Sequence, residues 1–291
     1  MSLALVFAVL SAALPSQYVI PGDKVFPEGV SLRPGTDQFF VSSTSNGTIY
    51  RGTLGKSRLK AFLPPGDDGR AVANGVRAGE DHLVVAGSTT GYIFVYDYRG
   101  RLVHRFATGS GGLINDVTIA PNGDVYATDS LRGVLFRISA KAASKRTSAT
   151  TQLKPFIDVK ETPIGQYCNG IVPAGDRYLL VVGLTTGVLG RIDLKTKQVR
   201  KVEGVLLPAG DGLARTGRTL YGVNSGKRVT QVKLSRDWLH GSVVRQITSP
   251  SFHLPTTVQI VGKRLMVVNS QFDRRNATPT LPFTVSAVRR P

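Results

Sequence analysis

The sequence has few of the residues that form disulfides or bind zinc in small folds. Cys168 is the only cysteine, so no disulfide can form within the chain, and we expect it to be a small buried hydrophobe. The four histidines form no cluster with cysteine, which disfavours zinc. Beyond the N-terminus no stretch is long and apolar enough to cross a bilayer, and strong helical periodicity is absent. These absences exclude a disulfide scaffold, a zinc module, a transmembrane bundle and a helical bundle.

Acidic residues are also scarce relative to basic ones. The chain has 37 Lys and Arg against 19 Asp and Glu, which gives a net charge of +18. The basic residues are dispersed through turns and outer strands, without a helix-turn-helix, zinc-finger or RNA-recognition signature. We therefore expect a monomer that is attracted to anionic surfaces or polymers but has no specific nucleic-acid site.

The N-terminus carries an apolar run from Leu3 to Leu14, near whose end Ser11, Ala12 and Ala13 are small residues suited to cleavage. It is too short to span a membrane, so we interpret residues 1–15 as a signal peptide and residues 16–291 as a single domain. The predicted location is secreted or periplasmic. A basic n-region is missing, and the alternative is an apolar N-terminal strand or tail.

A repeat with a period near 45 residues runs through this domain. Six times a short polar residue, usually followed by Gly, opens an apolar stretch, at steps of 46, 41, 54, 42 and 45 residues. We call these the ring residues: Glu28, Asn74, Asn115, Asn169, Asp211 and Thr256. Such a period with strand-like segments between its marks predicts an all-β fold, a six-bladed β-propeller with four-stranded blades around a central channel.

Three further features refine this prediction. A second Gly mark recurs 17 to 19 residues after four of the ring residues, at Gly47, Gly91, Gly133 and Gly187. The last blade has few strands, so we expect the segment near 17–25 to close the ring. The Ala/Ser/Thr/Lys-rich insertion 139–152 accounts for the 54-residue step, and we interpret it as an exposed basic loop.

The ring residues would meet at one mouth of the channel, because the innermost strands of a propeller converge there. They would supply carboxylate, amide and hydroxyl oxygens, which are the ligands that Ca²⁺ prefers. The alternative is that Asn-Gly and Asp-Gly occur for turn geometry alone, since both dipeptides favour turns. Turn chemistry does not favour Glu28, and this argues for a cation site.

The segments FPEGV, LINDVTIAPNGDVY, YCNGI and AGDGL occur in the order and spacing of a known family. The pattern resembles the regucalcin–gluconolactonase family, whose kin include diisopropyl-fluorophosphatase, paraoxonases and strictosidine synthases. The resemblance covers about residues 24–290. It is fairly specific for the superfamily and much less so for the substrate.

The resemblance implies a cofactor and roles for named residues. Glu28, Asn115, Asn169 and Asp211 would hold Ca²⁺ or another divalent cation, with Asp211 also the base or nucleophile of a hydrolase. Asn74, Asp116, His253 and Thr256 would bind substrate or line the channel. Sugar lactonases of the family carry Arg where this chain has Leu113, which favours a more apolar substrate.

Three functions remain open at this stage. The first is a secreted hydrolase of small esters or lactones that depends on a divalent metal. The second is a non-catalytic, metal-stabilised propeller that binds an anionic partner through its basic surface. The third is a metal-independent condensing enzyme, which ranks last because the late catalytic Glu that it requires is missing.

Overall fold

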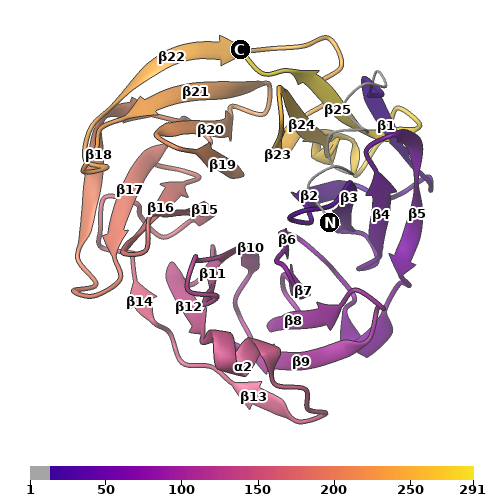
Figure 1. Cartoon of the computed structure of the whole chain (residues 1–291), viewed down its shortest axis with the longest axis horizontal. Helices are drawn as coiled ribbons and strands as arrows, with labels where there is room; N and C mark the ends of the chain where they lie inside the picture. Colours follow the sequence, from indigo (N-terminus) through magenta and orange to yellow (C-terminus); the bar gives the residue numbers. More distant parts are fainter. Residues whose placement is uncertain (1–13) are drawn as a thin grey trace.

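The computed structural model describes residues 14–291, so residues 1–13 of the predicted signal peptide lie outside the described part. Within it, nearly all regular structure is β, in sheets arranged around a common centre (Figure 1). The short helical segments are η1 (Asp67–Gly69), α2 (Ala140–Ser144) and η2 (Phe272–Arg274). None of the helices in residues 14–291 has the length and apolar character needed to cross a membrane.

Four of the sheets hold four or five strands each, and in each of them the strand that comes first along the chain lies nearest the centre. We number the sets of strands along the chain and describe the second to the fifth first. The second set, in spatial order, is β13 (Thr150–Gln152), β9 (Leu102–Ala107), β8 (Tyr92–Asp97), β7 (His82–Ala86) and β6 (Val76–Ala78). The third is β10 (Ile114–Ile119), β11 (Val125–Asp129), β12 (Val134–Ile138) and β14 (Ile157–Asp158). The fourth is β15 (Cys168–Ala174), β16 (Tyr178–Gly183), β17 (Val188–Asp193) and β18 (Val199–Leu206). The fifth is β19 (Leu213–Thr216), β20 (Thr219–Asn224), β21 (Arg228–Leu234) and β22 (Gly241–Ile247).

The remaining sheet has eight strands and joins the two ends of the domain. Its order is β2 (Pro27–Leu32), β3 (Gln38–Ser43), β4 (Ile49–Thr53), β5 (Lys56–Leu63), β1 (Gln17–Ile20), β25 (Phe283–Arg289), β24 (Arg264–Asn269) and β23 (Pro255–Val261). β1 pairs antiparallel with β25, with Gln17 opposite Ser286, and touches β5 through one parallel pair. The prediction that the N-terminal segment closes the ring is therefore confirmed.

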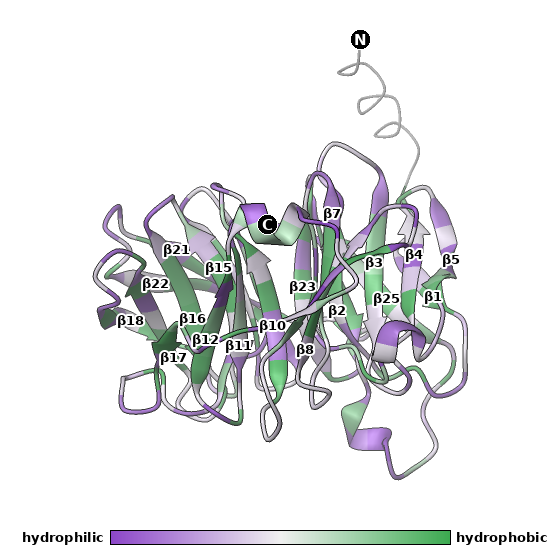
Figure 2. Cartoon of the chain, turned by 90° about the horizontal axis from the view of Figure 1, so that it is seen from below, coloured by the Kyte–Doolittle hydropathy of each residue, from purple (hydrophilic) through white to green (hydrophobic). Residues whose placement is uncertain are grey.

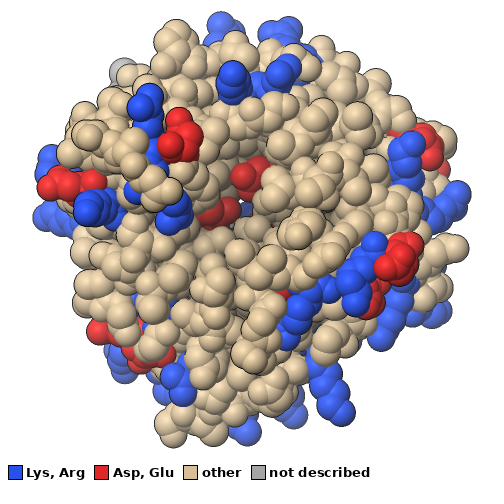
Figure 3. All heavy atoms as spheres, turned by 180° about the vertical axis from the view of Figure 1, so that it is seen from behind, with Lys and Arg blue, Asp and Glu red and all other residues tan. Residues whose placement is uncertain are grey.

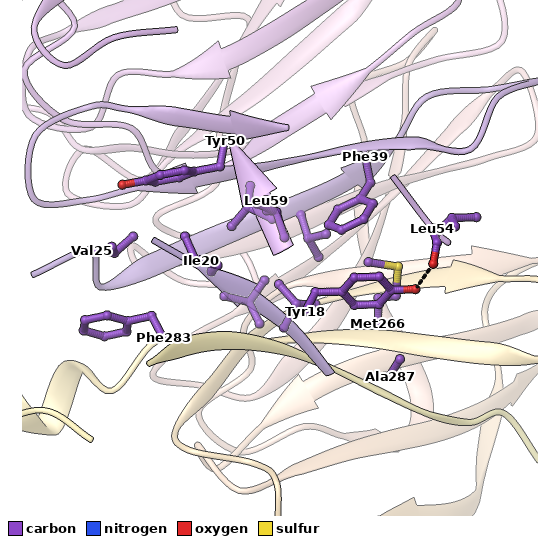
Figure 4. Packing of buried hydrophobic residues seen from close by; sticks show 14 of the residues in the cluster. Tyr18, Ile20, Val25, Phe39, Tyr50, Leu54, Leu59, Met266, Phe283 and Ala287 are labelled. Carbon is purple, nitrogen blue, oxygen red and sulfur yellow. Dashed lines mark hydrogen bonds between the residues drawn. The ribbon is translucent and has the colours of Figure 1, made fainter. Parts of the chain in front are cut away.

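The hydrophobic core lies between neighbouring sheets and not inside one of them. Strands carry the hydrophobic residues, whereas the loops at their two ends are mostly hydrophilic (Figure 2). Figure 4 shows the cluster at the closure, where the Tyr18 ring meets Phe39 edge-on at 5.0 Å between centroids. The Tyr18 hydroxyl donates to the Leu54 carbonyl at 2.8 Å, so the buried phenol is satisfied. This packing anchors β1 between β5 and β25.

The segment 139–152, predicted to be an exposed basic loop, is mostly exposed and basic, but much of it is helix or strand and not loop. α2 is capped by Ser139, whose hydroxyl accepts from the Ala142 N–H, and it buries Ala143. β13 then pairs in parallel with β9, the outer strand of the preceding set, with Thr150 opposite Arg105. The insertion thus supplies partners for the edge of β9, which would otherwise expose unpaired backbone groups.

Candidate functional site

The six ring residues occupy equivalent places at the starts of the innermost strands. Glu28, Asn115, Asn169 and Thr256 lie within the first two residues of β2, β10, β15 and β23. Asn74 and Asp211 lie two residues before β6 and β19. These strands surround the centre in Figure 1, so the repeat that the sequence predicted brings the six residues to one end of the channel.

A local irregularity in the strands sets the direction of these side chains. β2, β10, β15 and β23 all shift register against their partner immediately after the first pair, over the ring residue and its successor. Such β-bulges bend the strand and re-aim a side chain. Asn74 and Asp211 sit in the same arrangement, because their N–H groups donate to Ala86 and Val223 carbonyls at 2.9 Å. The sequence therefore marks six bulges rather than six turns.

The glycines that follow the ring residues are required by close approach of the next sheet. A Cβ on Gly170 would lie 2.2 Å from the Asp211 carbonyl oxygen, and one on Gly29 would lie 2.8 Å from the Val76 nitrogen. Gly75 and Gly212 are equally crowded by backbone of the following set. None of these four glycines has a positive φ, whereas Gly47, Gly91, Gly133 and Gly187 all do. Turn geometry therefore explains the second Gly mark but not the first.

Hydrogen bonds link five of the six pairs of neighbouring sets around this end of the channel. The Gly75 N–H donates to Asn115 O at 2.7 Å, and the Gly212 N–H donates to Thr256 O at 2.8 Å. Side chains make further links: Ser42 Oγ donates to Asn74 O, Thr128 Oγ1 to Asn169 O at 2.9 Å, and Thr256 Oγ1 to Glu28 O at 2.9 Å. The last of these joins the final set to the first, so most of the ring residues are held through their own backbones.

The pKa values of three carboxyl groups at this end, those of Glu28, Asp116 and Asp211, are all raised, chiefly by burial. Burial raises the pKa of Glu28 well above its usual range, and the charges of Asp211 and Asp116 raise it further. Burial, and then the Asp116 charge, raise the pKa of Asp211 from 3.8 to about 8. Figure 3 shows acidic side chains inside the central hollow of one face, whereas Lys and Arg lie mostly toward the outer edge of that face. The three cannot all be ionised there without a compensating positive charge.

Two of the four predicted ligands have an oxygen atom that is buried without a hydrogen-bond partner, Glu28 Oε2 and Asn169 Oδ1. The other group of the Asn169 amide is engaged, since hydrogen bonding from this side chain lowers the pKa of Asp211. Asn115 donates its Nδ2 to Ser130 Oγ at 2.8 Å, which orients its own oxygen. Buried polar atoms in proteins are almost always satisfied, so the unpaired oxygens fit a bound cation.

The donor set is a mixed one. Within residues 14–291, no group of three or more His, Cys, Asp or Glu side chains is placed to bind a metal ion without other ligands. The predicted set is different, because only Glu28 and Asp211 are carboxylates and the other two ligands are amides. Such a set suits Ca²⁺, which takes amide oxygens as readily as carboxylates, better than zinc.

Asp116 has a structural place in this ring. Its Oδ1 accepts from the Val117 N–H at 2.8 Å and its Oδ2 from the Ile171 N–H at 3.2 Å, so it ties β10 to β15. Both oxygens are therefore occupied, and Asp116 acts on the site through its charge. Sequence reasoning predicted it as a channel-lining or substrate residue, a role that the geometry does not favour.

The other residues predicted for substrate binding differ in their surroundings. Asn74 is half-buried at the ring, whereas Thr256 is buried and its hydroxyl is taken by the Glu28 carbonyl. His253 has an exposed side chain, and its backbone N–H donates to Asn269 Oδ1 at 3.1 Å. Sequence reasoning missed Thr128 and Ser130, which lie near the end of a second strand and hold Asn169 and Asn115. In the sequence, the only indication of this role is a Ser or Thr near the end of the second strand of the set.

Comparison with known proteins bears on the fold. No family model matches the sequence, and no curated protein matches it. Two solved structures of lyases cover most of the chain. A streptogramin B lyase is 9% identical, with a TM-score of 0.62 over 94% of this chain and 96% of that one. Virginiamycin B lyase from Staphylococcus aureus is 11% identical, with a TM-score of 0.62 over 94% and 98%.

A third structure, of a nidogen/laminin complex, is 16% identical with a TM-score of 0.62 over 78% of this chain and 81% of that chain. The neighbours are propeller-like, and the sheets here surround one centre. The fold is a β-propeller. At these identities the likeness extends to the fold alone, and the function must be argued from the ring residues.

Proposed function

We propose that this propeller is a secreted hydrolase of small esters or lactones that depends on a divalent cation. The observation that carries the proposal is the pair of buried, unpartnered oxygens, Glu28 Oε2 and Asn169 Oδ1, within the predicted ligand set. The order and spacing of the motifs, which resemble the regucalcin–gluconolactonase family, support it. The secreted location rests on the predicted signal peptide alone.

We also propose that the propeller has six blades. The eight-stranded sheet divides naturally into β2–β5 and a second set formed by β23, β24, β25 and β1, which meet through a single β1–β5 pair. Together with the other four sheets this makes six sets, one for each ring residue. The six buried hydrophobic clusters of the described residues support the division, since each draws mainly on two consecutive sets.

Glu28, Asn115, Asn169 and Asp211 would hold the cation. Two carboxylates balance the charge of a divalent ion, and the amides add ligands without adding charge. When bound, Ca²⁺ would polarise a carbonyl oxygen as a Lewis acid. The chain itself fixes the ligands beforehand, through Ser130 on Asn115 and through the inter-sheet backbone bonds.

Asp211 is the residue that we assign as base. The Asn169 side chain hydrogen-bonds its carboxylate and fixes it next to the ring. A carboxylate held beside the cation can accept the proton of a water that the cation orients. In this role Asp211 would take a proton from water while the reacting carbonyl lies at the ring.

The surface beside the ring favours an apolar substrate. Leu131 follows Ser130 directly and is 41% exposed, and Tyr167 precedes Cys168 and Asn169 and is 38% exposed. The two are held together, because Gln166 Nε2 donates to the Leu131 carbonyl at 2.6 Å. Exposed apolar residues next to a polar centre are typical of a substrate site. Leu113, where sugar lactonases have Arg, agrees with this.

The test is Ca²⁺ binding and ester hydrolysis by the purified protein and its Glu28→Gln and Asp211→Asn variants. We expect one Ca²⁺ per chain in the wild type and at least a tenfold weaker affinity in each variant, since each loses a charged ligand. Hydrolysis of aryl esters and lactones should be lost on chelation. Glu161→Gln, an exposed carboxylate, is the matched control and should bind normally. Calcium-independent hydrolysis, or equal binding by all four proteins, would refute the proposal.

A second candidate function is a non-catalytic propeller that binds an anionic partner. The net charge of +18 and the Lys and Arg side chains toward the outer edge of the face in Figure 3 favour it. The same experiment separates the two functions. Ca²⁺ binding without any hydrolysis, together with salt-sensitive binding to heparin or polyphosphate, would support this second function.

A further inference from the structure

A separate pocket of about 200 Å³ opens along the same inner strands, beyond the ring residues. It takes residues from five of the strands: Arg77 (β6), Thr118 (β10), Val172 (β15), Arg215 (β19) and Gln259 (β23). Each of these follows its ring residue by three or four positions. At about 3.3 Å per residue the pocket therefore lies some 10 Å further along the channel.

Two arginines define the chemistry of this pocket. Arg77 Nε donates to the Val117 carbonyl at 3.3 Å, and Arg215 Nε donates to the Pro173 carbonyl at 2.7 Å. Each bond crosses to a neighbouring sheet and so fixes the guanidinium against the channel wall. Arg215 also donates through Nη1 to the Gly217 carbonyl and lies over the Trp238 ring, 5.0 Å from its centroid. A guanidinium has five N–H donors, so each arginine retains donors beyond these bonds.

The positive charge in the pocket is not neutralised by the described residues. None of the side chains that line it is acidic, and neither arginine belongs to an ion pair within residues 14–291. Burial lowers the pKa of Arg215, the direction expected for a cation without a counter-charge. Asp116 lies close enough for the Arg77 charge to oppose the rise in its pKa that burial causes. Backbone N–H groups take both of its oxygens, and it forms no ion pair with Arg77 within the described residues.

We propose that this pocket binds a small oxyanion between Arg77 and Arg215. Planar guanidinium groups recognise carboxylate and phosphate oxygens in a bidentate manner, and the Thr118 hydroxyl and Gln259 amide add neutral polar groups. The volume equals roughly seven water molecules at about 30 Å³ each, which admits phosphate or a short dicarboxylate. This site is independent of the ring and of the proposed hydrolysis.

Trp238 provides a built-in reporter for the test, because it is the only tryptophan in the chain and lies against Arg215. Inorganic phosphate and succinate are titrated separately into metal-depleted protein, with tryptophan fluorescence and calorimetry as readouts. We expect saturable binding of at least one anion at one site per chain. Binding of phosphate but not succinate would identify a phosphate site, and binding of succinate but not phosphate would identify a carboxylate site.

Arg77→Gln and Arg215→Gln should each weaken this binding about ten- to hundredfold, because each removes a charged hydrogen-bond partner. Arg77→Lys and Arg215→Lys should bind with intermediate affinity, and melting curves confirm that all variants fold. Arg99→Gln, which removes one exposed charge, is the matched control. The proposal is overturned if neither anion saturates, or if Arg99→Gln weakens binding as much as Arg77→Gln. It is also overturned if binding is lost only when Arg245, Arg289 and Arg290 of the outer pocket are replaced.

Discussion

The two stretches of the central channel are built by the same strands yet carry opposite charges. At the ring, Glu28, Asp116 and Asp211 are buried together, and two oxygens lack partners. Three or four residues further on, Arg77 and Arg215 face a pocket without an acidic side chain. Repetition of a strand therefore does not repeat its chemistry, because bulges aim the first side chains of each strand and regular pairing aims the later ones. The net charge of +18 does not reveal that acidic and basic side chains occupy different stretches of the channel.

Asp116 stands between the two stretches, and its removal should have the largest effect on stability. Asp116→Ala leaves the Val117 and Ile171 N–H groups without acceptors, at about 1–3 kcal/mol each, so we expect a loss of about 2–6 kcal/mol. Urea unfolding measures it. Asp116→Asn keeps one acceptor, so its free energy of unfolding should lie between those of the wild type and Asp116→Ala. Asp23 is exposed, and Asp23→Ala should change the stability little. A neutral Asp116→Ala would contradict its structural role.

Gly170→Ala tests whether close packing holds the ring end together. The new Cβ would lie 2.2 Å from the Asp211 carbonyl, so backbone must move, at about 1–3 kcal/mol. The matched control is Gly55→Ala, where a Cβ would meet nothing within 4 Å. Thermal melting compares the two. Equal melting temperatures would mean that the ring end yields more easily than the structure indicates.

The pH dependence of the stability of the metal-free protein tests the acidic half of this comparison. Because the pKa of Asp211 is raised from 3.8 to about 8, the folded state holds a proton that the unfolded chain has released. This contribution to stability is complete below about pH 4 and is lost as the pH rises through about 8. Melting temperatures between these values should therefore fall more steeply for the wild type than for Asp211→Asn. Parallel profiles would show that Asp211 titrates normally.

The smallest expected effect on metal binding is that of Ser130→Ala, which frees the Asn115 amide. The variant loses two buried hydrogen bonds, from Asn115 Nδ2 at 2.8 Å and to Cys168 O at 2.7 Å, at about 1 kcal/mol each. Ca²⁺ affinity should fall several-fold because the Asn115 oxygen is no longer oriented. Calorimetry on this variant and on Ser144→Ala, in the exposed helix α2, gives the comparison. An unchanged affinity would place Asn115 outside the ligand set.

The sequence predicts the propeller and the positions of the ring residues because both are carried by a short motif that recurs at a nearly constant period. The Gly after each of four ring residues is required where the backbone of the next sheet approaches closely, and the repeat places that contact at the same point of each set. Cys168, predicted to be buried, is fully so. What the sequence did not indicate depends on contacts between distant segments. β13 pairs with a strand of another set, and Arg77 and Arg215 face one pocket although about 140 residues separate them.

The pairing of β1 with β25 sets an order of events during synthesis. Gln17 and Ser286 are opposite each other but 269 residues apart, so β1 emerges from the ribosome long before its partner exists. At about 5–20 residues per second this delay is roughly 15–50 s. Throughout it the Tyr18 cluster lacks its C-terminal half and keeps apolar surface exposed. The nascent chain therefore passes through an open-ringed state whose first and last sheets are the natural targets of chaperones.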